Sequence, residues 1–148
     1  MKQHILPDFI VIDDDVINNM ICHKIIELTI PGAVVKTFIK PEKGLEYIAR
    51  TYSDNGAKDA VVFLDINMPS INGWEVLDRL NHFPEHVKDR VKIFMLSSSV
   101  DPNEKDKANN NQLVSGYLTK SISKAKLEAL FPDYIKQEGD HFEVESEL

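Results

Sequence analysis

Short apolar runs that alternate with longer amphipathic segments constrain the fold of this chain most strongly. Four runs are clear, over residues 9–12, 34–39, 61–64 and 91–96, and a weaker fifth candidate covers 116–119. The runs lack the strict alternation of a strand with one wet face, which indicates strands buried on both faces. Burial on both faces is typical of a parallel sheet covered by helices.

The segments between the runs are predicted helices. After the first run, apolar residues recur at helical spacing until Pro31-Gly32 ends the pattern. These residues are Ile17, Met20, Ile21, Ile25 and Leu28. Further helices are predicted over 41–51, 72–81, 102–110 and 124–131, two of them with a proline in the first turn. The alternation predicts an α/β fold, a doubly wound five-stranded parallel sheet flanked by five helices, which is a flavodoxin-like architecture.

Length and composition predict one domain. The chain has 148 residues, near the commonest domain size. We expect an N-terminal extension over 1–7, the domain over 8–133, and an acidic C-terminal tail over 134–148 with no output domain. The tail is either solvated or, over 142–144, an added edge strand.

Charge and hydropathy exclude several classes of function. The net charge of −7 opposes binding to a phosphate backbone, so we expect no direct contact with nucleic acid. No stretch approaches the ~20 apolar residues that span a bilayer, so we expect a cytoplasmic protein without membrane contact. One cysteine, Cys22, can form neither an internal disulfide nor a cysteine-rich zinc site.

Polar residues stand at the carboxyl ends of four predicted strands. Asp13-Asp14-Asp15 follow the first strand, Asp65 ends the third, Ser97 the fourth and Lys120 the fifth. Open α/β sheets bind ligands outside these ends, at the point where the strand order reverses. For the common order 2-1-3-4-5 this point lies between the first and third strands, which end in the acidic residues.

The acidic cluster predicts a magnesium site. Consecutive aspartates repel one another unless a cation is near, although Asp15 is also explained as the N-cap of the next helix. Mg²⁺ prefers one or two carboxylates, a carbonyl and several waters. We therefore predict Asp14 as a direct ligand, Asp13 as acting largely through water, and Asp65 and the backbone carbonyl of Asn67 as further ligands.

The same residues can perform phosphoryl transfer. With Mg²⁺ offsetting the charge, a carboxylate oxygen of Asp65 can attack phosphorus in line to give an acyl phosphate. The hydroxyl of Ser97 and the ammonium of Lys120 would then donate to the phosphoryl oxygens.

Four ordered blocks carry a family resemblance: FIVIDDD, VVFLDINMP with NG following, MLSSS and SGYLTKS. In order and spacing they resemble the conserved blocks of the response regulator receiver domain of bacterial two-component systems, over roughly residues 8–133. The resemblance implies that Asp13 and Asp14 are the acidic pair, Asp65 the phosphoacceptor and Lys120 the site lysine. It also implies that Asn67 is the carbonyl donor, and that Ser97 and Tyr117 are the switch residues.

The resemblance also implies partners. A sensor histidine kinase or a histidine phosphotransfer protein would donate the phosphoryl group. The face formed by the fourth helix, fifth strand and fifth helix of the family would signal to an unknown protein target, and it is also a candidate surface for a homodimer. The protein would not be an enzyme, apart from self-catalysed phosphotransfer and dephosphorylation.

One departure from the family concerns the residue after the lysine. The family usually has proline there on a cis peptide, and this chain has Ser121. A cis bond before a non-proline residue costs ~2.5 to 4 kcal/mol, so the loop is either strained or trans, and the placement of Lys120 depends on which.

Two other functions compete with the phosphoacceptor. A receiver-like module that acts by contacts alone, without phosphorylation, is compatible with the Ser121 substitution. A Mg²⁺-dependent phosphatase of the haloacid dehalogenase type also uses an aspartyl phosphate. Phosphatases of that family have a second Asp two residues after the nucleophile, where this chain has Asn67.

Overall fold

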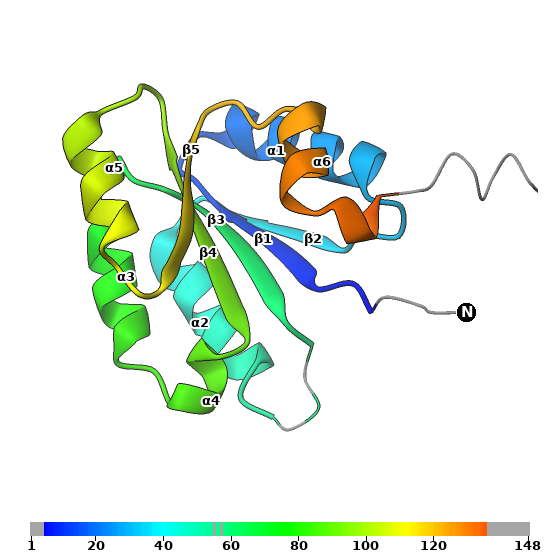
Figure 1. The fold of residues 1–148 in the computed structure, drawn as a ribbon. Helices are drawn as coiled ribbons and strands as arrows, with labels where there is room; N and C mark the ends of the chain where they lie inside the picture. Colours follow the sequence, from blue (N-terminus) through cyan, green and yellow to red (C-terminus); the bar gives the residue numbers. More distant parts are fainter. Residues whose placement is uncertain (1–4, 55, 57, 136–148) are drawn as a thin grey trace, which may run out of the picture.

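The core of the fold is a five-stranded parallel sheet, seen in a computed structural model that describes residues 5–54, 56 and 58–135 (Figure 1). The strand order is β2-β1-β3-β4-β5, and every neighbouring pair is parallel. The predicted fold class is confirmed. The strands are β1 (Asp8–Ile12), β2 (Val35–Phe38), β3 (Ala60–Asp65), β4 (Val91–Ser97) and β5 (Val114–Thr119).

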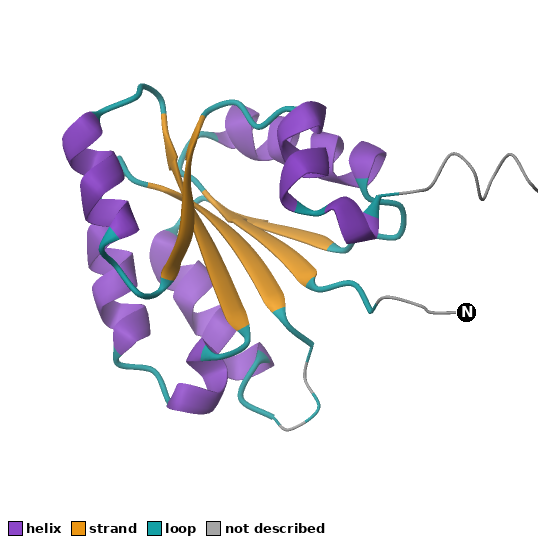
Figure 2. Cartoon of the chain, viewed as in Figure 1, coloured by secondary structure: helices purple, strands orange, loops and turns teal. Residues whose placement is uncertain are grey.

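Helices cover both faces of the sheet, as the cartoon in Figure 2 shows. They are α1 (Val16–Thr29), α2 (Pro41–Thr51), α3 (Gly73–Asn81), α4 (Glu85–Lys88), α5 (Pro102–Asn109) and α6 (Lys124–Leu130), followed by a 3-10 turn, η1 (Pro132–Tyr134). The prediction of five helices missed α4, because a helix of four residues is too short to show periodicity. The helices that the family resemblance numbers four and five are therefore α5 and α6 here.

Two apolar cores lie on opposite faces of the sheet. The first packs β-strand residues such as Ile12 and Leu64 against α2 and α3, while the second packs residues such as Phe9 and Phe63 against α1 and α6. β3 is buried along its whole length, and the edge strand β2 is not. This pattern agrees with the non-alternating apolar runs that predicted the sheet.

The apolar stripe that predicted α1 faces mostly outward, whereas the apolar side of an amphipathic helix usually packs on the core. Ile17 is 67% exposed, Met20 65% and Leu28 65%, and only Ile25 of the stripe packs against the core. The buried face of α1 consists instead of Asn18, Asn19, Cys22, Ile26 and Thr29. Helical spacing identified the helix correctly, but it did not identify the side that meets the sheet.

Local signals fix where the helices begin. Asp15 caps α1 by accepting from the backbone N–H groups of Ile17 and Asn18, as predicted. Asn72 forms a capping box with Glu75 at the start of α3. A side chain on Gly73 would meet the backbone oxygen of Asp65 at 2.7 Å, so glycine lets α3 begin directly beneath the end of β3.

The ends of the chain are only partly described. Tyr134 stacks on Phe131 and packs with Ile135 against the second core. The tail beyond, including the alternative strand over 142–144, lies outside the described residues, so the domain boundaries at 1–7, 8–133 and 134–148 stay a prediction. Among the described helices, none is long and apolar enough to cross a membrane.

Candidate functional site

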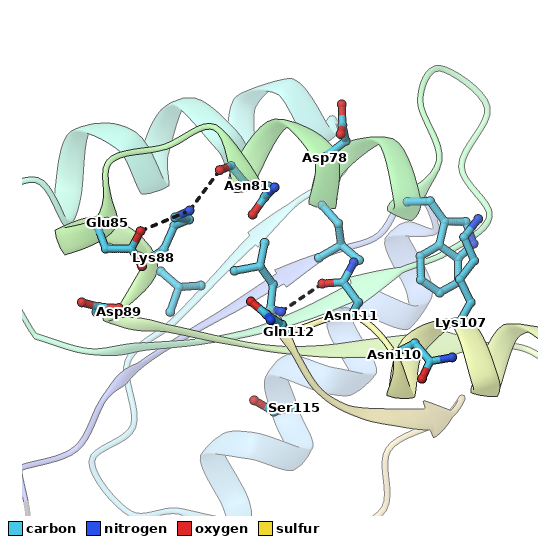
Figure 3. Close-up of a pocket in the computed structure, with 14 residues that line it drawn as sticks. Asp78, Asn81, Glu85, Lys88, Asp89, Lys107, Asn110, Asn111, Gln112 and Ser115 are labelled. Atoms are coloured by element: carbon cyan, nitrogen blue, oxygen red, sulfur yellow. Dashed lines mark hydrogen bonds and ion pairs between the residues drawn. The ribbon is translucent and has the colours of Figure 1, made fainter.

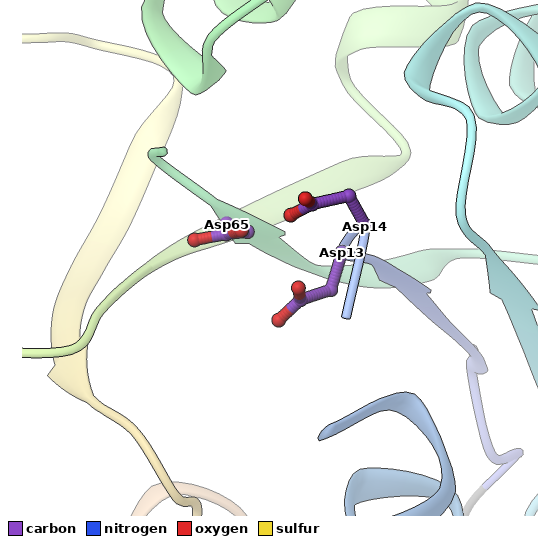
Figure 4. Close-up of side chains that lie close together, drawn as sticks. All are labelled: Asp13, Asp14 and Asp65. Atoms are coloured by element: carbon purple, nitrogen blue, oxygen red, sulfur yellow. The ribbon is translucent and has the colours of Figure 1, made fainter. Parts of the chain in front are cut away.

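Three aspartates converge at the carboxyl edge of the sheet. Asp13 and Asp14 follow β1, and Asp65 ends β3, the neighbouring strand. One carboxylate oxygen from each lies within 4.8 Å of the others, and Figure 4 shows the three side chains around a common space. Asp13 and Asp65 are buried, whereas Asp14 is exposed. The convergence predicted from the strand ends is therefore present.

Asp13 is held in place by hydrogen bonds from the start of α1. Its Oδ1 accepts from the N–H of Asp15 at 2.9 Å, and its Oδ2 accepts from the Asn18 side chain at 2.7 Å. The Asn19 side chain donates to the backbone oxygen of Asp13 at 2.9 Å. Both carboxylate oxygens of Asp13 thus have protein partners, while the Asp14 carboxylate makes no hydrogen bond or ion pair to the described residues.

Lys120 bridges the two buried aspartates. Its Nζ lies 2.9 Å from Asp13 Oδ2 and 3.2 Å from Asp65 Oδ1. Burial by itself would lower the pKa of Lys120, but its hydrogen bond to Asp13 and the charges of both carboxylates raise that pKa above its usual value. The Lys120-Ser121 peptide bond is cis, and the ammonium group reaches the site with serine in place of the usual proline.

The charged form of Asp65 is disfavoured when Lys120 is the only cation beside it among the described residues. Burial and then the nearby charge of Asp13 raise its pKa from 3.8 to about 7, although Lys120 and the N–H of Asn67 oppose this. The Asn67 N–H donates to Oδ1 at 3.2 Å. The other oxygen, Oδ2, is buried and has no hydrogen-bond partner among the described residues. A buried carboxylate oxygen without a partner destabilises the protein, and a bound cation or water would remove this cost.

These residues fit a hard divalent cation. Three carboxylates offer oxygen ligands, one of them exposed and otherwise unpaired, and one buried oxygen has no partner. Both carboxylate oxygens of Asp13 already accept hydrogen bonds, and its role as a ligand acting largely through water stays a prediction. The role of the Asn67 carbonyl as a ligand stays a prediction.

Ser97 and Tyr117 share one hydrogen-bond network at the end of β4. The Ser97 hydroxyl lies 2.8 Å from the backbone oxygen of Ser99 and 3.0 Å from Glu104 Oε1. The Tyr117 hydroxyl lies 3.1 Å and 3.0 Å from the same two oxygens and accepts from the N–H of Asp101. The structure thus joins the two predicted switch residues to each other, and through Glu104 to α5.

Comparison with known proteins decides the family. The family model described as the response regulator receiver domain matches residues 9–131. The chain belongs to this family. Two solved structures of receivers are 28% identical: a two-component response regulator from Cytophaga hutchinsonii and a response regulator receiver protein from Dyadobacter fermentans. The first has a TM-score of 0.77 and the match covers 87% of this chain and 96% of that one; the second has 0.76, 87% and 98%.

A third structure shares the receiver fold at lower identity. It is the CheX-CheY-BeF3-Mg²⁺ complex from Borrelia burgdorferi, with 19% identity, a TM-score of 0.69 and coverage of 89% of this chain and 92% of that one. No curated protein matches the chain significantly. The receiver fold and the two-component family are thus both shown for this chain.

Sequence reasoning missed three polar residues of this receiver. Asn18 and Asn19 orient Asp13, and Glu104 joins the switch residues. A signal for the first two was present, because both asparagines lie within one turn of the acidic cluster and outside the apolar stripe of α1. Glu104 gave no such signal, since an acidic residue in the first turn of a helix is common.

A groove of the receiver lies away from Asp13, Asp14 and Asp65. It has a volume of about 650 Å³ and runs between α3, α4, α5 and the start of β5 (Figure 3). Its lining mixes acidic, basic and amide side chains, and Lys88 is already paired with Glu85. Lys107 of α5 lies over the ring of Trp74 of α3, 4.6 Å from the centroid. This contact links α5 to the helix that begins beneath Asp65.

Proposed function

We propose that this receiver accepts a phosphoryl group on Asp65 in the presence of Mg²⁺ and passes the signal to a protein partner. The observation that carries the proposal is the pairing of one partly buried Lys120 ammonium with two buried aspartates, beside a buried Asp65 oxygen that has no partner among the described residues. Such a cluster is poorly tolerated unless a further cation joins it. A Mg²⁺ ion would supply that charge and offset the charge of an incoming phosphoryl group.

The chemistry is one in-line displacement. A carboxylate oxygen of Asp65 forms a bond to phosphorus while the phosphorus–nitrogen bond of a donor phosphohistidine breaks, and the imidazole leaves with the bonding electrons. The Lys120 ammonium, already within 3.2 Å of Asp65, would donate to a phosphoryl oxygen. The Ser97 hydroxyl, on the neighbouring strand, would turn from Glu104 to donate to another.

The protein serves as a phosphoacceptor rather than a turnover enzyme. Water hydrolyses the acyl phosphate and returns the Asp65 carboxylate, so each phosphoryl group is accepted once and lost once. The phosphatase alternative predicts many turnovers on small phosphate esters. The absence of a second carboxylate two residues after Asp65, where Asn67 stands, supports the phosphoacceptor.

The phosphoryl donor would be a sensor histidine kinase or a histidine phosphotransfer protein. The exposed apolar side chains of the first two turns of α1 support a protein donor, because they directly follow the acidic cluster. These side chains are Val16, Ile17, Met20 and Ile21. A donor that brings its phosphohistidine to Asp65 can cover this patch, which gains free energy from burying apolar surface.

The output surface would be the face of α5, β5 and α6. Phosphorylation adds roughly −1.5 to −2 charges beside Ser97, by analogy with phosphorylated hydroxyls. Movement of Ser97 frees Tyr117, which repacks that face for an unknown target or for a second copy of the chain. A cytoplasmic location, expected from the sequence, stays a prediction.

Intact-mass measurement after treatment with acetyl phosphate and Mg²⁺ tests the proposal. We expect the native chain to gain the mass of one phosphoryl group, and the Asp65→Asn variant to gain none. EDTA should prevent the gain in the native chain. If the native chain gains no mass and shows no affinity for Mg²⁺ by Trp74 fluorescence, the module that acts without phosphorylation is the better account.

A further inference from the structure

Glu104 occupies the centre of the contact between the two switch residues. It lies in the first turn of α5, and a single oxygen, Oε1, is 3.0 Å from the Ser97 hydroxyl and 3.0 Å from the Tyr117 hydroxyl. The backbone oxygen of Ser99 lies within 3.1 Å of the same hydroxyls. Two donors thus face two acceptors, one of which is a carboxylate.

The count of protons decides how this network behaves. Each hydroxyl has one proton, and either hydroxyl can donate it to Glu104 or to the Ser99 oxygen, because each of these oxygens can accept from both. The bond to the carboxylate is charge-assisted and therefore the stronger of the two. While Glu104 is present, the Ser97 hydroxyl can donate its proton to this residue of α5 and does not have to turn toward Asp65.

We propose that Glu104 is a positioning residue that holds the Ser97 hydroxyl away from Asp65 until a phosphoryl group competes for its proton. This inference rests on the proposed function. When Ser97 turns to the phosphoryl oxygen, Glu104 keeps only Tyr117 as a donor, so the change is transmitted to α5 and β5. The strength of the Glu104 bond then sets how readily the site retains a phosphoryl group.

Removal of the carboxylate should favour the phosphorylated arrangement. Without Glu104, two hydroxyls compete for the Ser99 oxygen alone, and the Ser97 proton is left available. Beryllofluoride, which mimics a phosphoryl group on aspartate, is the probe, and Trp74 fluorescence is the readout because Lys107 of α5 lies against its ring. We expect Glu104→Ala to raise the affinity for beryllofluoride in saturating Mg²⁺ by about 10-fold, the effect of one charge-assisted hydrogen bond.

Two further variants separate positioning from charge. Glu104→Gln keeps an acceptor oxygen without the charge, so we expect a rise of about 3-fold, and it carries the test if the alanine variant does not fold. Asp106→Asn, an exposed position on the same helix, removes the same charge without touching Ser97 and should change the affinity less than about 2-fold. The affinity for Mg²⁺ alone should be the same in all of them.

A double-mutant cycle with Ser97→Ala gives the decisive result. If Glu104 acts through the Ser97 hydroxyl, Glu104→Ala should change the beryllofluoride affinity less than about 2-fold in the Ser97→Ala background. An equal rise in both backgrounds, or no rise in the native background, would overturn the inference and leave the phosphoacceptor function standing. Failure of the native chain to bind beryllofluoride with Mg²⁺ would overturn both.

Discussion

Replacement of Asp65 by asparagine should stabilise the metal-free protein, although it removes the residue on which function depends. Burial and the charge of Asp13 raise the pKa of Asp65 to about 7 in the folded protein, against 3.8 for an ordinary aspartate. The folded state therefore binds a proton more tightly than the unfolded state between these two values. Stability from this carboxyl is complete below pH 3.8 and is lost as the pH rises through 7.

The size of the effect follows from the two pKa values. Each pH unit between them corresponds to about 1.4 kcal/mol, so ionisation of Asp65 costs the folded state about 4 kcal/mol at pH 8. At pH 5 the same linkage gives a cost of about 1.7 kcal/mol. The Asp65→Asn variant has no such cost, so its advantage in free energy of unfolding should grow by about 2 to 3 kcal/mol from pH 5 to pH 8.

Urea denaturation of both proteins in EDTA at pH 5 and pH 8 measures this advantage. Asp106→Asn, which removes an exposed carboxylate from α5, is the matched control and should behave like the native chain at both pH values. Addition of Mg²⁺ at 100 times its dissociation constant should stabilise the native chain by about 2.7 kcal/mol and remove most of the difference. A variant that is less stable than the native chain at pH 8 in EDTA, or an advantage that is equal at both pH values, would refute the reasoning.

Three other substitutions or reactions test separate parts of the structure. Lys120→Met leaves Asp13 and Asp65 facing each other without a cation, so the free energy of unfolding in EDTA at pH 8 should fall by about 2 to 4 kcal/mol; a fall below about 0.5 kcal/mol would show that the pair is not buried as described. Ile17→Ser should change the free energy of unfolding by less than about 0.5 kcal/mol and leave labelling by acetyl phosphate intact. The variant should accept a phosphoryl group from a phosphohistidine protein more slowly than the native chain does. Equal rates of transfer from that donor would exclude the exposed apolar patch of α1 from docking. Burial raises the pKa of Cys22 to about 11, so a thiol reagent at pH 8 should react only on unfolding, and reaction at the rate of a free thiol in native buffer would contradict the burial.

The sequence predicted which polar side chains gather at the carboxyl edge of the sheet, because parallel topology fixes where strand ends lie. Once the apolar runs were read as parallel strands, Asp13, Asp65, Ser97 and Lys120 had to appear at one edge of the sheet. The distances between Lys120 and the two buried aspartates confirm that part of the prediction. It needed no knowledge of side-chain packing, since each strand end is local in sequence.

Residues that act through helices were harder to predict. A helix can be rotated about its axis without any change in its residues or its length, and the rotation decides which of them reach the site. Glu104 reaches Ser97 only because α5 presents its first turn to the end of β4. The one-turn helix α4 was not predicted for a simpler reason, because a helix of four residues is too short to show a periodic pattern.

The rotation of α1 shows how the site itself can decide such a question. Hydrophobicity alone favours turning Ile17, Met20 and Leu28 toward the sheet, because burial of each would contribute about 1.5 to 3 kcal/mol. That rotation would take Asn18 away from the buried Asp13 carboxylate, which would then lose one of its hydrogen bonds. With Asp15 as cap and both asparagines on Asp13, the first turn of α1 keeps its amide side chains inward, and the apolar stripe that begins next to the acidic cluster faces outward. The hydrogen bonds that orient a site carboxylate thus also create the apolar surface that a phosphodonor can cover.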